Sequence, residues 1–281
     1  MVTATSADGP IALELNVDAA LLLKELVGID TYPPVLALMP NVYHLDDRRR
    51  VHEAVEAQLA EAGVLVDGRV HPVVERWLQC LYRPDTEMVA RIVDTGRDGE
   101  ARGMLRMSLV RSGSDHVLAV RNDDQIVVQS IFQEGHNLEI LSAAVLSAMG
   151  TVPPTTFEPW RVTAAELTAL PVETDERRRA IAELGAEPKT AAVLARALET
   201  IVRWAEVLVI EHHDGETPRP QVAMSVVDTS AGRLVVSPAI AMDGEVWSTY
   251  LPGDDAALRS GIGALVELLP GRSWFETSRI G

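Results

Sequence analysis

Alternation of hydrophobic and polar positions marks two separate stretches of this chain, and a helical spacing of hydrophobic positions marks most of the rest. Alternation predicts β-strands. In the first half the predicted strands are residues 11–17, 88–94, 102–111, 116–121 and 125–132, and in the second half they are 204–212, 219–228, 233–237 and 245–251. Runs of Gly, Ser, Asn and Asp separate neighbouring strands, as turns require. The pattern therefore predicts two antiparallel groups of strands.

Hydrophobic residues spaced about 3.6 positions apart predict the helices. These cover residues 19–28, 46–62, a segment that starts after His71-Pro72, 137–149, 162–170, 175–184, 188–201 and 254–269. Asp18 precedes the first of them and is the expected N-cap, while Gly28 follows it as a stop. Apart from strand 11–17, each half of the chain thus has helices before its strands and one helix after them.

A local pattern occurs twice. In residues 116–149 and again in residues 232–269, two strands joined by an acidic turn lead into an amphipathic helix, at an offset of about 117 residues. This predicts one domain over residues 1–281, made of two related halves at about 11–150 and 160–275. The expected fold class is α+β, with helices against one antiparallel sheet. Strands 125–132 and 222–227 carry apolar groups on both faces, so we expect part of the sheet to be covered on both sides or to offer a docking surface.

Net charge narrows the classes of partner. The chain carries 41 acidic and 25 basic residues, a formal net charge of −16, and such a field repels nucleic acid and anionic membranes. The single cysteine, Cys80, lies in an apolar helical stretch, where it is expected to be a small buried hydrophobe in a reducing compartment. We find neither a signal-peptide pattern nor an apolar run long enough for membrane insertion. The expectation is a cytoplasmic protein.

Candidate chemistry is sparse. The seven histidines show no metal-ligand spacing, and Gly261-Ile262-Gly263 matches no phosphate loop. A possible catalytic cluster lies close together in the sequence at Ser112, Ser114, Asp115 and His116. However, four small polar residues between strands are typical of a tight turn. The sequence therefore predicts no enzyme, no cofactor, no metal and no catalytic residue.

An alternative class stays open, namely a small-molecule-binding or hydrolytic α+β domain. It requires a pocket with converging polar groups. His116 with Asp115, near Arg121, is the best candidate for such a group.

Three segments near the C-terminus resemble the EspG proteins, the cytosolic chaperones associated with ESX (type VII) secretion in mycobacteria and related actinobacteria. They are VVDTSAGRLVVSP, DGEVWSTYLPG and LLPGRSWF, and YPPVLALMP and HVLAVRNDDQIVV extend the resemblance into the N-terminal half. It covers residues from about 13 to 275. The resemblance implies a central antiparallel sheet flanked by N- and C-terminal helical bundles with a quasi-twofold axis, and a non-enzymatic protein without a small-molecule substrate.

The resemblance also implies the partner, which is the helical tip of PPE proteins within PE/PPE heterodimers, kept soluble until the secretion machinery receives it. A purely structural part of the secretion apparatus is a third possibility. Exposed Met and Trp are enriched in interfaces, and the last strands contain several, although a core position is the simpler expectation for each. We expect the partner-binding residues to be the apolar Met224, Ile240 and Met242 beside a polar rim of Asp228, Arg233, Ser237 and Asp243.

Overall fold

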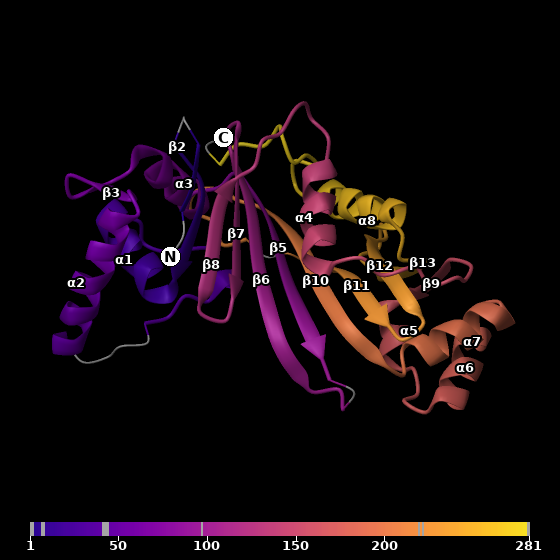
Figure 1. The fold of residues 1–281 in the computed structure, drawn as a ribbon. Coiled ribbons are helices and arrows are strands. Elements are labelled where there is room, and N and C mark those ends of the chain that lie inside the picture. The colour runs from indigo at the N-terminus through magenta and orange to yellow at the C-terminus, as the bar shows by residue number, and fades with distance from the viewer. Residues whose placement is uncertain are drawn as a thin grey trace.

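The computed structural model describes residues 3–6, 9–40, 45–96, 98–218, 220 and 222–279, and these residues form an α+β fold around one antiparallel sheet of eleven strands (Figure 1). The strand order is β1-β2-β8-β7-β6-β5-β10-β11-β12-β13-β9. The strands are β1 (Thr3–Ser6), β2 (Gly9–Asn16), β5 (Thr86–Thr95), β6 (Ala101–Ser112), β7 (Asp115–Asn122), β8 (Gln125–Ser130), β9 (Trp160–Thr163), β10 (Ile201–Glu211), β11 (Met224–Thr229), β12 (Gly232–Ile240) and β13 (Val246–Pro252). A separate ribbon pairs β3 (Leu65–Val66) with β4 (Arg69–Val70).

Helices gather at both ends of the sheet and over its middle. The N-terminal bundle contains α1 (Val17–Val27), α2 (Leu45–Glu61) and α3 (Pro72–Tyr82), with the short 3₁₀ helix η1 (Pro34–Leu36) between α1 and α2. The C-terminal bundle contains α5 (Ala164–Thr168), α6 (Thr174–Glu183) and α7 (Pro188–Ala197), while α4 (Glu139–Met149) and α8 (Asp255–Glu267) each follow a group of strands. The predicted sheet with flanking bundles is confirmed (Figure 1).

Helix ends follow from local chemistry. The side chain of Asn16, not that of Asp18, caps α1, because its Oδ1 accepts a hydrogen bond from the N–H of Ala19 at 2.8 Å. Gly28 ends the same helix in the left-handed conformation that glycine adopts without strain, with φ at 72°. Helix α3 begins at Pro72, where a missing N–H costs nothing.

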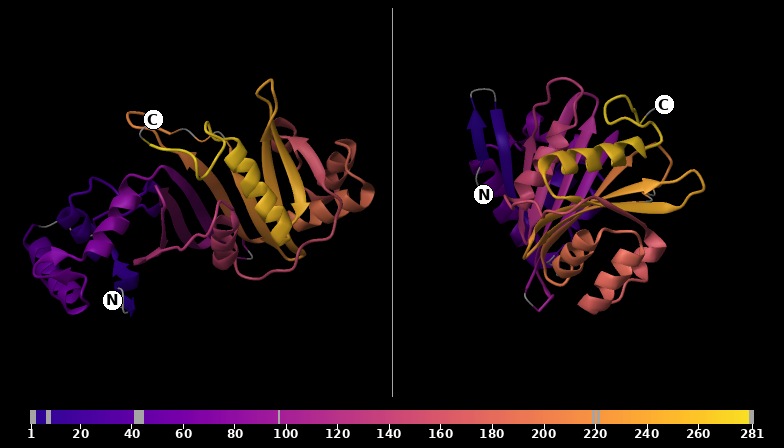
Figure 2. Two further views of the ribbon diagram at one scale, coloured as in Figure 1. Left: turned by 90° about the horizontal axis from the view of Figure 1, so that it is seen from above. Right: turned by 90° about the vertical axis from the view of Figure 1, so that its right-hand side faces the viewer.

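The two faces of the sheet are covered differently. On one face, α8 and α4 lie over the central strands, and Val226 and Val235 pack there in a core shared with Ile262 of α8. On the opposite face, the two bundles cover only the ends of the sheet. Val227 and Leu234, the strand neighbours of the first pair, belong to the core of the C-terminal bundle. Figure 2 shows α8 and the pair α6–α7 on opposite sides of the sheet.

The N-terminal bundle lies on the same face as the C-terminal one. Val117, Ala119, Ile126 and Val128 of β7 and β8 share its core, and the strand register places them on the same face as Val110 of β6. The middle of this face, formed by β6, β5 and β10, is therefore left between two helical bundles. We call it the central face.

The order of elements repeats about the pairing of β5 with β10. On one side of this pair the strands run β6-β7-β8-β2 and on the other side β11-β12-β13-β9. Helix α4 follows β8 as α8 follows β13, and three helices precede both β5 and β10. This arrangement confirms the quasi-twofold repeat in the fold. That residues 1–281 form one domain of two related halves stays a prediction.

Several predicted boundaries were wrong. Trp160–Thr163 is an edge strand paired with β13, so the helix expected over 162–170 is reduced to α5. Helix α7 ends at Ala197, and β10 begins at Ile201 because it pairs with both β5 and β11. Strand β11 begins at Met224; of the residues expected before it, 219 and 221 lie outside the described residues. The sequence patterns missed β1, β3, β4, β9 and η1.

The C-terminal segment after α8 crosses the ends of β5 and β6 and is held there by Arg111. This side chain is buried, and its guanidinium donates to the carbonyls of Trp274 and Thr277, each at 2.5 Å. It also forms an ion pair with Asp85 at 3.2 Å. The indole Nε1 of Trp274 donates to Nε2 of His116 at 3.2 Å. The last described residues are thus fastened to the first half of the chain.

Candidate functional site

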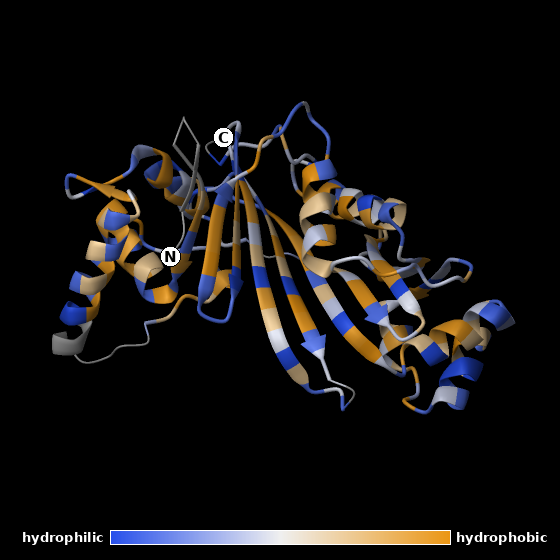
Figure 3. Ribbon diagram, in the orientation of Figure 1, coloured by the Kyte–Doolittle hydropathy of each residue, from blue (hydrophilic) through white to orange (hydrophobic). Residues whose placement is uncertain are grey.

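The central face holds an apolar groove of about 300 Å³. Its floor comes from β5 and β10, whose alternate residues point away from α4 and α8, and one wall comes from η1. The lining residues are Pro34, Val35, Glu87, Val89, Arg91, Glu206, Leu208 and Ile210. Figure 3 shows hydrophilic residues interrupting the hydrophobic ones along β5 and β6.

Cross-strand pairs organise the floor of this groove. Val89 lies opposite Leu208, and Arg91 lies opposite Glu206. The guanidinium Nε of Arg91 donates to Oε2 of Glu206 at 3.1 Å, and the two side chains are 51% and 31% exposed. An ion pair with this exposure contributes little to stability. The floor therefore presents an apolar strip beside a charged one.

Glu87 at the end of the groove is buried, and each of its two carboxylate oxygens has a polar partner. Ser108 Oγ donates to Oε1 at 2.7 Å, and Nε2 of His212 lies 3.0 Å from Oε2. The order of contacts is Ser–Glu–His, so the carboxylate separates the hydroxyl from the imidazole. A nucleophilic triad needs the imidazole next to the hydroxyl, and this cluster lacks that contact.

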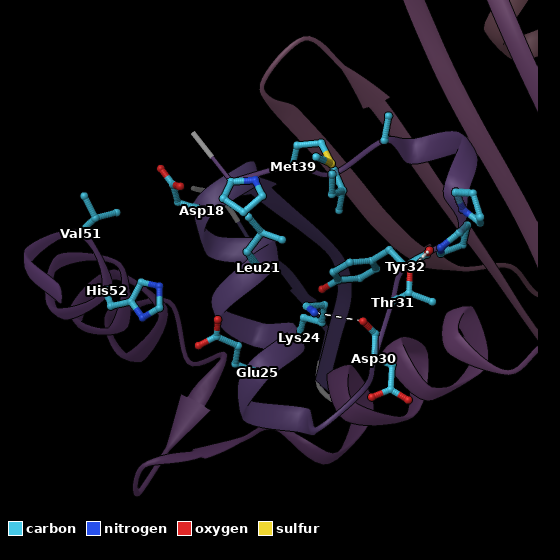
Figure 4. A pocket seen from close by; sticks show the side chains of 15 residues that line it. Asp18, Leu21, Lys24, Glu25, Asp30, Thr31, Tyr32, Met39, Val51 and His52 are labelled. Atoms are coloured by element: carbon cyan, nitrogen blue, oxygen red, sulfur yellow. Dashed lines mark hydrogen bonds between the residues drawn. The ribbon is translucent and has the colours of Figure 1, made fainter. Parts of the chain in front are cut away.

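Two further cavities adjoin the groove through shared residues. Pro34 also lines a cavity of about 410 Å³ against the N-terminal bundle, where Lys24 Nζ donates to the carbonyl of Asp30 at 3.0 Å (Figure 4). Ile210 also lines a cavity of about 240 Å³ at the end of β10, and Val209, Leu265 and Leu269 place this cavity mainly on the α8 side of the sheet. Hollowed surface thus extends from the N-terminal bundle to β5 and β10 on the central face.

Three of the seven predicted partner-binding residues are interior. Met224 is fully buried in the core beneath α8. Asp228 and Arg233 are also buried, and they form a two-pronged ion pair, with Nε to Oδ1 at 2.6 Å and Nη2 to Oδ2 at 2.9 Å. Arg233 also donates to the carbonyl of Met149 at the end of α4. Their expected place on a surface rim was wrong, because the end of α4 covers this side of the hairpin.

The other four lie along β12 and its turn to β13. Ser237 and Ile240 are half-buried, and Met242 is fully exposed at the turn. Asp243 Oδ1 accepts the N–H of Glu245 at 3.0 Å, which fixes the turn. The structure therefore brings Met242 and Asp243 together at the hairpin tip, and places Ile240 against the cavity on the α8 side of the sheet.

The polar cluster of the alternative class does not converge. His116 and Arg121 lie on opposite faces of β7, since residues an odd number apart alternate. His116 is buried against Trp274, and burial lowers the pKa of its imidazole below 6.5. Arg121 instead donates to the carbonyls of Leu36 and Asp123, both at 2.7 Å. Residues 113–114 form the predicted tight turn between β6 and β7.

Cys80 is buried as predicted, and burial raises the pKa of its thiol to about 12. Within the described part of the chain, no three His, Cys, Asp or Glu side chains are grouped closely enough to hold a metal ion. No described helix has both the length and the apolar character of a membrane span.

Sequence reasoning missed the floor of the groove. Its residues come from 87–91 and 206–210, which become neighbours only through the pairing of β5 with β10. A signal was present, since Arg91 and Glu206 each interrupt an otherwise apolar run at the centre of a strand. Opposite charges at such positions are typical of a cross-strand pair.

Comparison with known proteins places this chain among secretion-associated proteins. A family model described as the EspG family matches residues 16–264. The ESX-1 secretion-associated protein EspG1 of Mycobacterium marinum is 29% identical over 277 residues, covering 97% of this chain and 94% of the relative. The ESX-3 secretion-associated protein EspG3 of Mycolicibacterium smegmatis is 30% identical over 275 residues, covering 95% and 90%.

A solved structure shares the fold. The Mycobacterium tuberculosis type VII secretion system chaperone EspG5, solved in complex with a PE25–PPE41 dimer, matches with a TM-score of 0.79 over 95% of this chain and 100% of that chain. The sequence identity is 22%, so this match establishes the arrangement of elements.

Proposed function

Because this chain belongs to the EspG family, we propose that it is a chaperone of a type VII (ESX) secretion system, which binds the helical tip of the PPE protein in a PE/PPE heterodimer. It keeps that tip from aggregating and presents the pair for secretion. The observation that carries this proposal is the apolar groove on the central face, open between two helical bundles. The bound state in which the EspG5 chaperone was solved supports it.

The physical basis is removal of apolar surface from water. A helical tip with exposed aliphatic or aromatic side chains gains roughly 25 cal/mol for each Å² that it buries, and only part of this gain survives as affinity. The groove is preformed by two paired strands, so little conformational entropy is lost on the chaperone side. No covalent step is required, and we assign no catalytic role or cofactor to this chain. We place its action in the cytoplasm.

The hairpin tip extends this proposed surface. Met242 is fully exposed, and Ser237 and Ile240 are half-buried along the same hairpin, so we assign Ser237, Ile240, Met242 and Asp243 to the margin of the client site. Met224, Asp228 and Arg233 are left out because a contact with a client would require them to leave the core.

Coexpression with the PE/PPE pairs encoded near this gene tests the function. We expect one pair that is insoluble alone to become soluble and to copurify with this chain. Substitution Leu208→Glu places a charge on the apolar floor and should weaken binding at least about tenfold. Val172→Glu is the matched control, because Val172 is 88% exposed in the loop before α6, away from the groove.

Met242→Glu tests the margin separately and should weaken copurification without changing thermal stability. If no pair is bound or solubilised by the unmodified chain, the proposed function is wrong. If Leu208→Glu binds as tightly as Val172→Glu does, the client binds elsewhere.

A further inference from the structure

Arginines from three adjacent strands stand side by side on the central face. The register pairs Arg121 of β7 with Arg106 of β6, and Arg106 with Arg91 of β5. Glu206 of β10 completes the line, opposite Arg91. We call Arg121, Arg106 and Arg91 the arginine row. Directly opposed like charges destabilise a sheet, so this row requires an explanation.

Two members of the row have partners inside the protein. Arg91 is paired with Glu206, and Arg121 is held by carbonyl oxygens of η1 and of the β7–β8 turn. The guanidinium of Arg106, between them, makes no hydrogen bond or ion pair with any other described residue. The charge of Arg106 also contributes to lowering the pKa of Arg121, after burial. The central charge of the row is thus repelled on one side and not neutralised.

The surroundings of Arg106 combine this charge with apolar surface. Val89 is its diagonal neighbour on β5, and diagonal residues in a sheet lie roughly 7–8 Å apart. Leu208 continues the apolar strip across β10. The whole chain carries a net charge of −16. An uncompensated positive charge at Arg106 is therefore opposite in sign to the net charge of the molecule. Screening confines such an effect to roughly 8 Å at physiological salt, and the row therefore acts on groups placed directly on it.

We propose that Arg106 receives a carboxylate of the client, from an Asp or Glu on the helical tip that lies on the central face. This inference rests on the proposed function and adds the chemistry of the segment that is bound. Successive turns of a helix lie 5.4 Å apart, so two client side chains one turn apart can contact Val89 and the long side chain of Arg106 together. The client segment accordingly carries an acidic residue three or four positions from an apolar one. The apolar side chain covers Val89 and Leu208, and the carboxylate accepts hydrogen bonds from Arg106.

The test compares Arg106→Gln with Arg259→Gln, using the PE/PPE heterodimer that copurifies with the unmodified chain as the probe. Arg259 is exposed on α8, on the other side of the sheet. Arg259→Gln therefore removes one positive charge, as Arg106→Gln does, but at a site distant from the arginine row. We expect Arg106→Gln to weaken binding at least about tenfold and to reduce the salt dependence of the dissociation constant. Arg259→Gln should change both by less than about twofold.

Thermal unfolding of the free chain separates recognition from a structural role. Removing an arginine that holds the fold lowers the melting temperature, whereas Arg106→Gln should leave it unchanged or raise it, since it relieves like-charge repulsion. On the client, reversal of the acidic residue to Lys should abolish binding, and Arg106→Glu should restore it.

Unchanged affinity of the heterodimer for Arg106→Gln would overturn the inference while leaving the proposed function intact. A lowered melting temperature together with weaker binding would also overturn it, because Arg106 would then support the fold. Failure of the unmodified chain to bind any heterodimer would overturn both proposals, and this outcome is visible before any variant is made.

Discussion

The buried ion pair between Asp228 and Arg233 gives a sharp test of which charged residues hold the hairpin together. The Asp228 and Arg233 side chains are 6% and 3% exposed, and both guanidinium–carboxylate hydrogen bonds are below 3.0 Å. Asp228→Ala leaves the arginine charge buried without its partner. Breaking one side of such a pair costs about 3–5 kcal/mol of unfolding free energy. For a chain of this size, that lowers the melting temperature by roughly 6 °C or more.

The environment of Arg233 adds to this cost. Its Nη2 donates to the carbonyl of Met149 at 3.2 Å, and Arg203 Nη1 donates to the same carbonyl at 3.0 Å. Cations at a helix C-terminus stabilise the helix through its dipole. Arg233→Met therefore loses a contact with α4 as well as the pair, and should destabilise at least as much as Asp228→Ala.

Urea and thermal unfolding, followed by circular dichroism, measure these effects. The double variant Asp228→Leu/Arg233→Met should be more stable than the sum of the single losses implies, because an apolar pair leaves no buried charge. Glu267→Ala is the control, since its pair with Arg272 is well exposed and should matter little. A single variant that unfolds like the unmodified chain but no longer binds a client would refute the structural role and restore Asp228 to the partner-binding surface.

Two further predictions concern His116, which packs against Trp274, and the glycines of α8. The pKa of His116 is held below 6.5 mainly by burial, so the folded state keeps the imidazole neutral while the unfolded chain takes up a proton below about pH 6.5. Stability should therefore be full above pH 6.5 and decrease as the pH falls below it, and His116→Gln should flatten this part of a urea-midpoint profile; parallel profiles would contradict the assignment. In α8, Gly263→Ala should increase the free energy of unfolding by about 0.5–1 kcal/mol through helix propensity, and so raise the melting temperature. The added Cβ meets nothing within 4 Å. Gly261→Ala should lower the melting temperature, since the Cβ would lie 2.4 Å from a methionine sulfur of β11, and shifts of the same sign in both variants would contradict this packing.

Local signals predicted most of the fold. The boundaries of α1 to α3 were predicted to within a few residues from Gly28, Pro72 and the helical spacing of hydrophobic residues before β5. The turn-forming groups correctly separated β5 to β8. The patterns failed where long-range pairing decides the conformation. Trp160–Thr163 continues smoothly into a helical pattern, and it forms a strand because β13 offers it a free edge.

The candidate site was harder to predict, for a reason visible at two positions. Asp228 and Arg233 flank a tight turn, and their pairing across the hairpin can be read from the sequence; their burial cannot, because it depends on the end of α4, some 80 residues earlier. Arg106 presents the reverse case. The role that we propose for it depends on two neighbouring strands and on the lack of a polar partner among the described residues, and periodicity reveals neither.

The fastening of the last described residues to Arg111 has a consequence for how the protein is made. The carbonyl of Trp274 that Arg111 holds lies 163 positions later in the chain, so a growing polypeptide that has emerged from the ribosome through β8 still lacks it. Until the segment after α8 has been made, that guanidinium has Asp85 and its near neighbours as partners, and the core beneath α8 stays open. Completion of this corner of the fold therefore waits for residues 274–277, and a nascent chain without them leaves the buried guanidinium short of two carbonyl partners.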